Sequence, residues 1–202
     1  MARSYRLERF TSGTGEWAGT APGPYRPAGP PGESATGTTK IEIRALQSDD
    51  GHSAVAVINR AAEWYAEFLP PAELHGPEMT LESWTEEARR MTWYGAFVGG
   101  LLVGVMAAED AGDAVLFRHA YVVPERQRQG IASMLHAHLE DHVDDAARII
   151  VGTYAANTKA RAALEAAGYL LSSDSEAVLR RYYDIPEDRL RSSVTYEKRL
   201  DR

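Results

Sequence analysis

Gly130 stands at a junction where the chain could bind a phosphate group. It follows an apolar run that ends at Pro124 and precedes a helical pattern that starts at Ile131. Because glycine has no side chain, an anion can approach the backbone, and the unpaired amides of the first helical turn point at it. Arg126 and Arg128 can add charge-assisted hydrogen bonds to phosphate. The pattern indicates a pyrophosphate site, with a simple tight turn at Gly130 as the alternative.

Two elements must position this loop. Residues 114–123 are rich in β-branched and aromatic side chains, which is typical of a strand buried on both faces. Pro124 ends that strand because proline fixes φ and lacks a donor. After the loop, apolar residues recur at steps of three and four from Ile131 to His142, which predicts an amphipathic helix.

The rest of the chain predicts further strands and helices around this run. Gly99 and Gly100 are a two-residue hairpin signal, so three consecutive antiparallel strands should precede the loop. The expected elements, in chain order, are a strand at 41–46, helices at 54–69 and 80–91, strands at 92–98, 101–107 and 114–123, a helix at 131–142, a strand at 148–153, a helix at 157–166, a strand at 169–171, a helix at 175–183 and a strand at 193–200.

Length and composition indicate one folded domain with an N-terminal extension. The chain has 202 residues, of which 44% are hydrophobic, enough for one core of common size. Residues 1–39 contain 7 of the 17 glycines and 5 of the 10 prolines, with few large apolar side chains. Such a segment cannot bury enough surface to offset its chain entropy. We therefore expect a disordered extension at 1–39 and a folded domain at 40–202.

Composition also excludes several classes of function. The absence of cysteine excludes disulfides, thiolate nucleophiles and zinc-thiolate sites. The formal net charge of -7 argues against general nucleic-acid binding, which requires a basic surface. No apolar run approaches the roughly 20 residues of a membrane span, and no signal-peptide pattern is present, so we expect a soluble cytoplasmic protein.

The loop sequence Gln-Arg-Gln-Gly-Ile-Ala at 127–132 resembles the Gln/Arg-x-x-Gly-x-Gly/Ala signature of the GCN5-related N-acetyltransferases, the GNAT superfamily. Asn157, before a helix that ends at Gly168 and Tyr169, resembles the second cofactor element of that family. The order of the expected elements is also similar, over about residues 40–200. The resemblance implies an α+β fold with a mixed, mostly antiparallel central sheet of six or seven strands and four or five flanking helices.

A finer resemblance is to one uncharacterised bacterial and archaeal branch of the superfamily. It is carried by residues 118–122, by Gly152 and Thr153, and by the Arg-x-Tyr-Tyr-x-Ile-Pro segment at 180–186. The branch does not identify the acceptor substrate. Oligomeric state also stays open, and a homodimer is an arrangement that the resemblance allows.

The resemblance implies an enzyme that binds acetyl-CoA as co-substrate. We expect direct transfer of acetyl to an amine of a small molecule or peptide, in a ternary complex and without a metal. A catalytically quiet acyl-CoA-binding or sensing module is the alternative. The implied cofactor-binding residues are Tyr121, Val122, Val123, Gln127, Arg128, Gln129, Gly130, Ile131, Ala132, Ser133 and Asn157.

His119 is the leading candidate for the general base. It lies on the strand where some members of the family carry a histidine, and an imidazole suits base chemistry near neutral pH. A core histidine held by hydrogen bonds is the alternative. Glu67, Glu73 and His75 are further candidates, because this region forms a wall of the acceptor pocket in relatives. His136, His138 and His142 are expected on a helix face, with no carboxylate that completes a metal site.

The acid that protonates the leaving thiolate is less clear from the sequence. Many members of the family place a tyrosine seven residues after the position of Asn157, but this chain has Leu164 there. Leucine cannot donate a proton. Another phenol, Tyr154, Tyr182, Tyr183 or Tyr196, is a candidate for this role, and of these we select Tyr154 and Tyr183. Protonation from solvent is another route, and weak activity is the third alternative.

Overall fold

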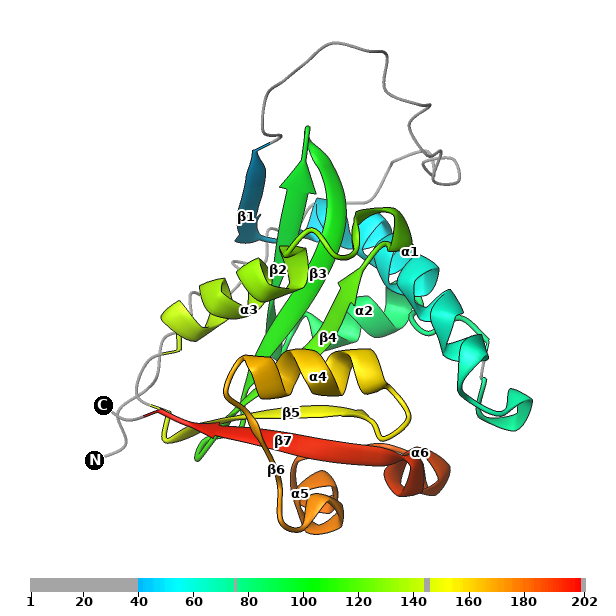
Figure 1. The fold of residues 1–202 in the computed structure, drawn as a ribbon. Coiled ribbons are helices and arrows are strands. Elements are labelled where there is room, and N and C mark those ends of the chain that lie inside the picture. The colour runs from blue at the N-terminus through cyan, green and yellow to red at the C-terminus, as the bar shows by residue number, and fades with distance from the viewer. Residues whose placement is uncertain (1–39, 75, 144–145, 201–202) are drawn as a thin grey trace.

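The computed structural model describes residues 40–74, 76–143 and 146–200. The extension expected at 1–39 and the candidate His75 lie outside this part. Within it, seven strands form one sheet in the order β1-β2-β3-β4-β5-β7-β6, and six α-helices pack around the sheet (Figure 1). The predicted α+β class and the predicted strand number are confirmed.

The strands are β1 (Ile41–Ala45), β2 (Met91–Val98), β3 (Leu101–Asp110), β4 (Val115–Val122), β5 (Arg148–Tyr154), β6 (Leu170–Leu171) and β7 (Ser193–Arg199). The helices are α1 (Gly51–Ala62), α2 (Leu81–Glu87), α3 (Ile131–Asp141), α4 (Thr158–Ala166), α5 (Ser175–Tyr182) and α6 (Glu187–Ser192). Across the described residues, none of these helices has the length and apolar character to span a bilayer.

Two predicted boundaries were wrong, and one helix was not predicted. The first helix ends at Ala62 and continues as a 3-10 helix, Glu63–Glu67. Met91 begins β2 instead of ending α2, and its side chain is buried in the core. Helix α6 was not predicted, because this short helix buries only Leu190 and so shows no repeated spacing of apolar residues.

The sheet opens between β4 and β5. These two strands are parallel, but they pair only where residues 115–117 face residues 149–151. Beyond that point β4 continues to Val122 and β5 to Tyr154 without pairing to each other. In the β3–β4 ladder, Ala107 faces Arg118 and Val105 faces Tyr121, so β4 carries one extra residue. The bulge includes His119, at a φ of 55°.

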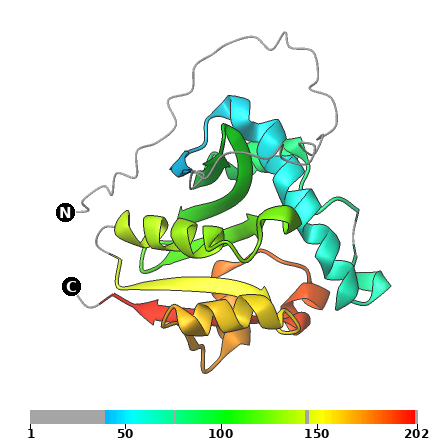
Figure 2. The ribbon, with the colours of Figure 1, turned by 45° about the horizontal axis from the view of Figure 1, so that its top comes forward.

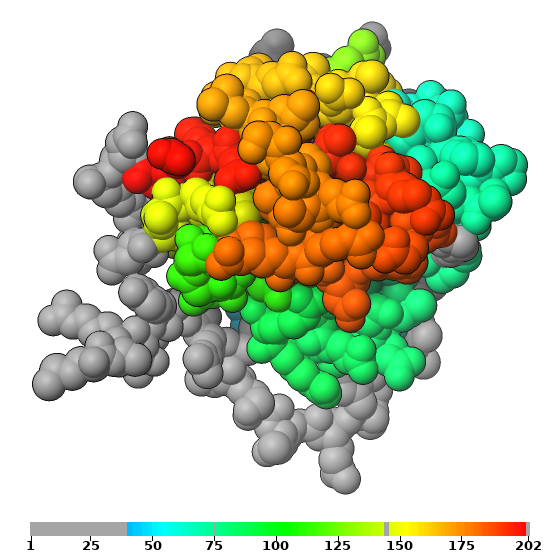
Figure 3. Space-filling view, turned by 90° about the horizontal axis from the view of Figure 1, so that it is seen from below, coloured from blue at the N-terminus to red at the C-terminus, as the bar shows by residue number. Residues whose placement is uncertain are grey.

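Helices cover both faces of the sheet. Figures 1 and 2 show α3 and α4 together in front of it. A Cβ added to Gly104 in β3 would lie 3.1 Å from Ile131, so α3 packs closely on this face. On the opposite face, Leu116 and Ile150 form a small apolar cluster with Val178 of α5. Figure 3 shows that α5 and α6 form much of the lower surface.

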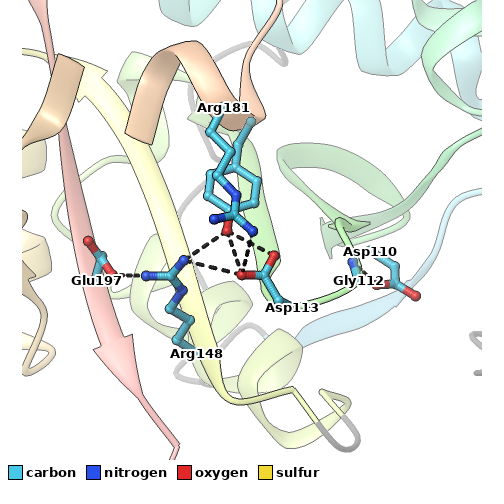
Figure 4. Close-up of polar contacts among 7 residues, drawn as sticks. Asp110, Gly112, Asp113, Arg148, Arg181 and Glu197 are labelled. Carbon is cyan, nitrogen blue, oxygen red and sulfur yellow. Dashed lines mark hydrogen bonds and ion pairs between the residues drawn. The ribbon is translucent and has the colours of Figure 1, made fainter. Parts of the chain in front are cut away.

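A polar network fixes α5 to the end of the sheet (Figure 4). Tyr182 of α5 donates to Asp113 in the β3–β4 turn at 2.8 Å, and Arg181 donates to the same carboxylate at 3.1 Å. Arg148 of β5 donates to Glu197 of β7 and to the Tyr182 hydroxyl, both at 2.8 Å. The hydrogen bond from Tyr182 and the two arginines lower the pKa of Asp113. The network therefore joins α5, β5 and β7 through charged contacts.

Candidate active site

A cavity of about 470 Å³ occupies the gap between β4 and β5. Residues from both faces of the sheet line it, including Ala137 of α3, Leu164 of α4 and Leu179 of α5. Because the two strands no longer pair here, their backbones leave the gap open. The cavity therefore gives one continuous space that reaches from the α3 and α4 side to the α5 side.

The start of α3 has free backbone donors at the edge of this cavity. The first helical hydrogen bond runs from the Met134 amide to the Gly130 carbonyl, at 2.9 Å. Within the described residues, the amides of Ile131, Ala132 and Ser133 have no acceptor, and no side chain caps the helix. Ala132 and Ser133 line the cavity. These amides, at the positive end of the helix dipole, can bind an anion.

Gly130 has the backbone geometry that this turn requires. Its φ of 78° is left-handed, and an added Cβ would meet no atom within 4 Å. Arg128 also has a positive φ, of 60°. Gln127 donates to the Val122 carbonyl at 3.0 Å and so ties the loop to the end of β4. Gln129 extends toward the Glu125 carbonyl, at 3.5 Å.

The end of β4 presents one backbone amide to the gap. The Val123 amide donates to Val103 in β3 at 3.0 Å. Because successive amides of a strand point to opposite sides, the Val122 amide points away from β3 and toward the gap. Tyr121 lines the cavity, whereas Val122, Val123 and the loop residues 127–131 lie outside its lining.

Small side chains from α3 and α4 widen the cavity on the front of the sheet. They are Ala132, Ser133, Ala137, Ala160, Ala163 and Ala167. Asn157 lies at the start of α4, where its Oδ1 accepts a hydrogen bond from the Ala160 amide at 3.0 Å. These small side chains leave space between the two helices, and Asn157 caps the start of α4.

His119 lines the cavity and lies beside a carboxylate. Its Nε2 lies 2.7 Å from Oε2 of Glu87, which ends α2. The ring stacks on Trp93, with centroids 4.9 Å apart and an interplanar angle of 21°. Burial raises the pKa of Glu87, but His119 and the nearby Arg118 and Arg90 outweigh burial and lower it overall. Glu87 is therefore a carboxylate beside the imidazole, and it was not found from the sequence.

Both candidate tyrosines line the cavity. The Tyr154 hydroxyl is buried without a hydrogen-bond partner among the described residues. Burial raises the pKa of Tyr154 and also that of Tyr183. The Tyr183 ring packs against Gly152, where an added Cβ would lie 3.2 Å from it. Leu164 lines the cavity at the position that many relatives give to tyrosine.

Glu67 lies away from this wall. Its side chain accepts a hydrogen bond from the Trp64 indole at 2.7 Å, and the residue is exposed. Glu67 does not line the cavity in the described structure. No group of three His, Asp or Glu side chains in the described ranges could hold a metal ion.

A polar cluster at one end of the cavity was missed by the sequence analysis. Tyr121 donates to Glu78 at 3.1 Å, and the Tyr65 hydroxyl lies 3.1 Å from that of Tyr121. Arg189 donates to Glu78 at 3.0 Å across 111 residues of sequence. Burial raises the pKa values of Tyr65 and Tyr121, so both phenols stay protonated. No local pattern indicates this cluster, because its members come from three distant segments.

A sequence-family model matches the central part of the chain. The sequence model of the acetyltransferase (GNAT) family matches residues 58–169, more than half of the chain. The chain therefore belongs to the GNAT acetyltransferase family, as the loop motif predicts. No curated protein sequence matches the chain.

Solved structures with the same fold include several acetyltransferases. The PaiA N-acetyltransferase from Thermoplasma acidophilum, in complex with coenzyme A, is 17% identical with a TM-score of 0.59, covering 80% of this chain and 99% of that chain. The ribosomal-protein-S18-alanine N-acetyltransferase from Escherichia coli is 18% identical with a TM-score of 0.61, and the match covers 81% of this chain and 96% of that chain. At this identity the neighbours support the fold.

Proposed function

We propose that the protein transfers acetyl from acetyl-CoA to an amine acceptor by direct attack in a ternary complex. The observation that carries the proposal is the gap between β4 and β5. It joins the free amides at the start of α3 to a cavity with His119 and Tyr154 in its wall. A thioester bound in this gap would lie beside groups that can move protons.

The cofactor end is assigned to the loop and to the two helices behind it. The amides of Ile131, Ala132 and Ser133 bind the diphosphate, with Gln127, Arg128, Gln129 and Gly130 shaping the turn. Tyr121, Val122 and Val123 border the pantetheine, and the Val122 amide stabilises the oxyanion that develops on the thioester carbonyl. Asn157 borders the same chain from α4. Small residues on α3 and α4 leave room for it.

The chemical step requires two proton transfers. The acceptor nitrogen attacks the thioester carbon, the carbon–sulfur bond breaks, and the proton lost by nitrogen goes to His119. Glu87, 2.7 Å from the imidazole, stabilises the imidazolium that forms. Tyr154 protonates the thiolate, because a phenol carries its proton at neutral pH and the residue lines the cavity. Tyr183 is the second candidate for this acid.

A catalytically quiet acyl-CoA-binding module is the second candidate function. Leu164 favours it, because a leucine borders the cavity where many relatives have a proton donor. In that case the protein would bind acetyl-CoA with the same amides but would release no thiol.

Release of free coenzyme A in the presence of a panel of primary amines separates the two functions. For the enzyme, we expect thiol release that depends on the amine. General bases typically contribute 10²–10⁴-fold, so His119→Ala should lower kcat by about 100-fold or more, with acetyl-CoA affinity retained. His142→Ala is the matched control, because His142 is exposed on the far end of α3. Binding without turnover, unchanged by His119→Ala, would support the quiet module.

A further inference from the structure

The cavity between β4 and β5 has an end on the α5 side of the sheet. Residues of α5, of α6 and of the segment between them line this end, namely Leu179, Tyr183, Ile185 and Arg189. Helices α3 and α4, where the diphosphate and the pantetheine are assigned, lie on the opposite face (Figure 2). A thioester that enters along α3 leaves the α5 end of the cavity free, so this end is the place for the acceptor.

Arg118 of β4 points to the α5 end of the cavity. Leu116 packs against α5, and alternate residues of a strand share a face. The Arg118 guanidinium lies 5.3 Å from the centroid of the Tyr183 ring. It also donates to Glu109 at 2.8 Å, and only 13% of the Arg118 side chain is exposed. This cation therefore already has a carboxylate partner inside the protein.

The other charged and imidazole side chains of the lining are paired in the same way. Their N–O distances are 2.7 Å for His119–Glu87, 3.0 Å for Arg189–Glu78, 3.4 Å for His136–Glu140 and 2.9 Å for Lys198–Glu140. Separating such a pair is costly, because one charge is then left without its partner away from water. An acceptor with a second charge would have to break one of these pairs to be neutralised.

Ile185 gives the α5 end an apolar contact surface. It lies between α5 and α6, it is partly exposed, and it lines the cavity. Ile185 belongs to neither apolar cluster of the described residues, so packing inside the protein leaves part of its side chain unused. Burial of this surface against a hydrocarbon group is favourable. The Tyr183 ring, which packs against Gly152, adds a second uncharged wall.

From this arrangement we propose that the acceptor is a monoamine with an uncharged hydrocarbon body. Its nitrogen lies beside His119, and its body extends along the α5 end of the cavity against Ile185. The inference rests on the proposed acetyl transfer and adds the class of acceptor. Amino acids and diamines are disfavoured, because the second charge of either would find every opposite charge of the lining already paired.

Three probes with the same six-carbon chain test the class of acceptor separately from turnover. They are hexylamine, 1,6-diaminohexane and 6-aminohexanoate, titrated by calorimetry into the full-length protein saturated with coenzyme A. We expect hexylamine to bind about tenfold more tightly than either of the others, because only their second charge must be buried without a partner.

Two substitutions of Ile185 test where the hydrocarbon binds. Ile185→Ala should weaken hexylamine binding by about threefold or more through lost apolar contact. Ile185→Asp supplies a carboxylate and should reverse the preference, so that 1,6-diaminohexane binds more tightly than hexylamine. Leu170→Asp is the matched control, because Leu170 is 75% exposed in β6 and does not line the cavity. Unchanged affinity for coenzyme A in each variant shows that the variant is folded.

Equal affinities for the three probes, or tightest binding of a doubly charged one to the unsubstituted protein, would overturn the inference. A preference for hexylamine that Ile185→Asp leaves intact would also overturn it. If hexylamine binds in an Ile185-dependent manner but no amine releases coenzyme A from acetyl-CoA, the proposed transfer fails and the apolar amine site stands. If the three probes are acetylated equally well, the transfer stands and the assigned class of acceptor fails.

Discussion

Gly130→Ala separates the two roles that the sequence leaves open for this glycine. If Gly130 is only a turn residue, the substitution should affect folding alone. If its open face admits the diphosphate of acetyl-CoA, the substitution should also weaken binding. The structure favours the second outcome, because an added Cβ would enter empty space beside the free amides of α3.

The expected magnitudes follow from the backbone angles. At a φ of 78° and a ψ of 1°, an alanine is left-handed, which costs roughly 1–2 kcal/mol. For a domain of this size, that cost lowers Tm by about 2–8 °C. A methyl group that displaces the diphosphate from its amides should raise the Kd for acetyl-CoA at least tenfold, or about 1.4 kcal/mol.

Calorimetric titration with acetyl-CoA and thermal unfolding measure the two effects. Gly112→Ala is the matched control: Gly112 has a φ of 84°, no atom within 4 Å of an added Cβ, and a place in the β3–β4 turn (Figure 4). We expect similar losses of Tm in both variants and a raised Kd only in Gly130→Ala. Equal Kd values in the two variants would refute the anion-binding role and leave the turn role.

Three further predictions concern the scaffold. Asp50 binds Arg44 through both oxygens, at 2.7 and 2.9 Å, and this pairing lowers its pKa. The pairing stabilises the fold above the unfolded pKa of Asp50, about 3.8, and this stabilisation is lost as pH falls through the lower pKa of the folded state. In urea unfolding, Asp50→Asn should therefore lower the free energy of unfolding by about 1–3 kcal/mol at pH 7 and by progressively less below about pH 4. An equal loss at pH 7 and below pH 4 would contradict the pairing. Asp113→Ala should lower Tm more at low salt than in about 1 M salt, because Asp113 loses an ion pair with the exposed Arg181. A loss of Tm that does not depend on salt would contradict this reason. Gly95→Ala would place a Cβ 2.5 Å from the Leu102 and Leu46 side chains, so chemical denaturation should show a loss of about 1–3 kcal/mol, and a neutral result would mean that the core can expand there.

Local patterns were sufficient for most of the fold. The Gly99-Gly100 hairpin, the strand that ends at Pro124 and the helix that begins at Ile131 all form where the sequence predicts them. These signals depend on residues within one or two turns of each other. Helix α6 was not predicted, because a single buried leucine cannot show the spacing of apolar residues that indicates a helix. Met91 lies in β2 and not in α2, because its position is determined by burial in the core and not by helical spacing.

The candidate site could be predicted only where it is local in sequence. The loop at 127–132 and His119 are found from motif and position, whereas Glu87, Glu78 and Arg189 are found only in three dimensions. The β4 bulge, with His119 at a φ of 55°, places its imidazole against Glu87 and Trp93. No sequence pattern predicted the bulge or the position that it gives to the His119 side chain. Glu67 was a candidate because its region of the chain forms a wall of the acceptor pocket in relatives. Its side chain accepts a hydrogen bond from Trp64 and does not line the cavity.

A crystal structure of the protein with bound acetyl-CoA tests most directly whether the gap between β4 and β5 holds the thioester. We expect the diphosphate on the amides of Ile131, Ala132 and Ser133, and the thioester carbonyl beside the Val122 amide. Density for acetyl-CoA at another surface, or none in crystals grown at saturating concentrations, would contradict the proposed site.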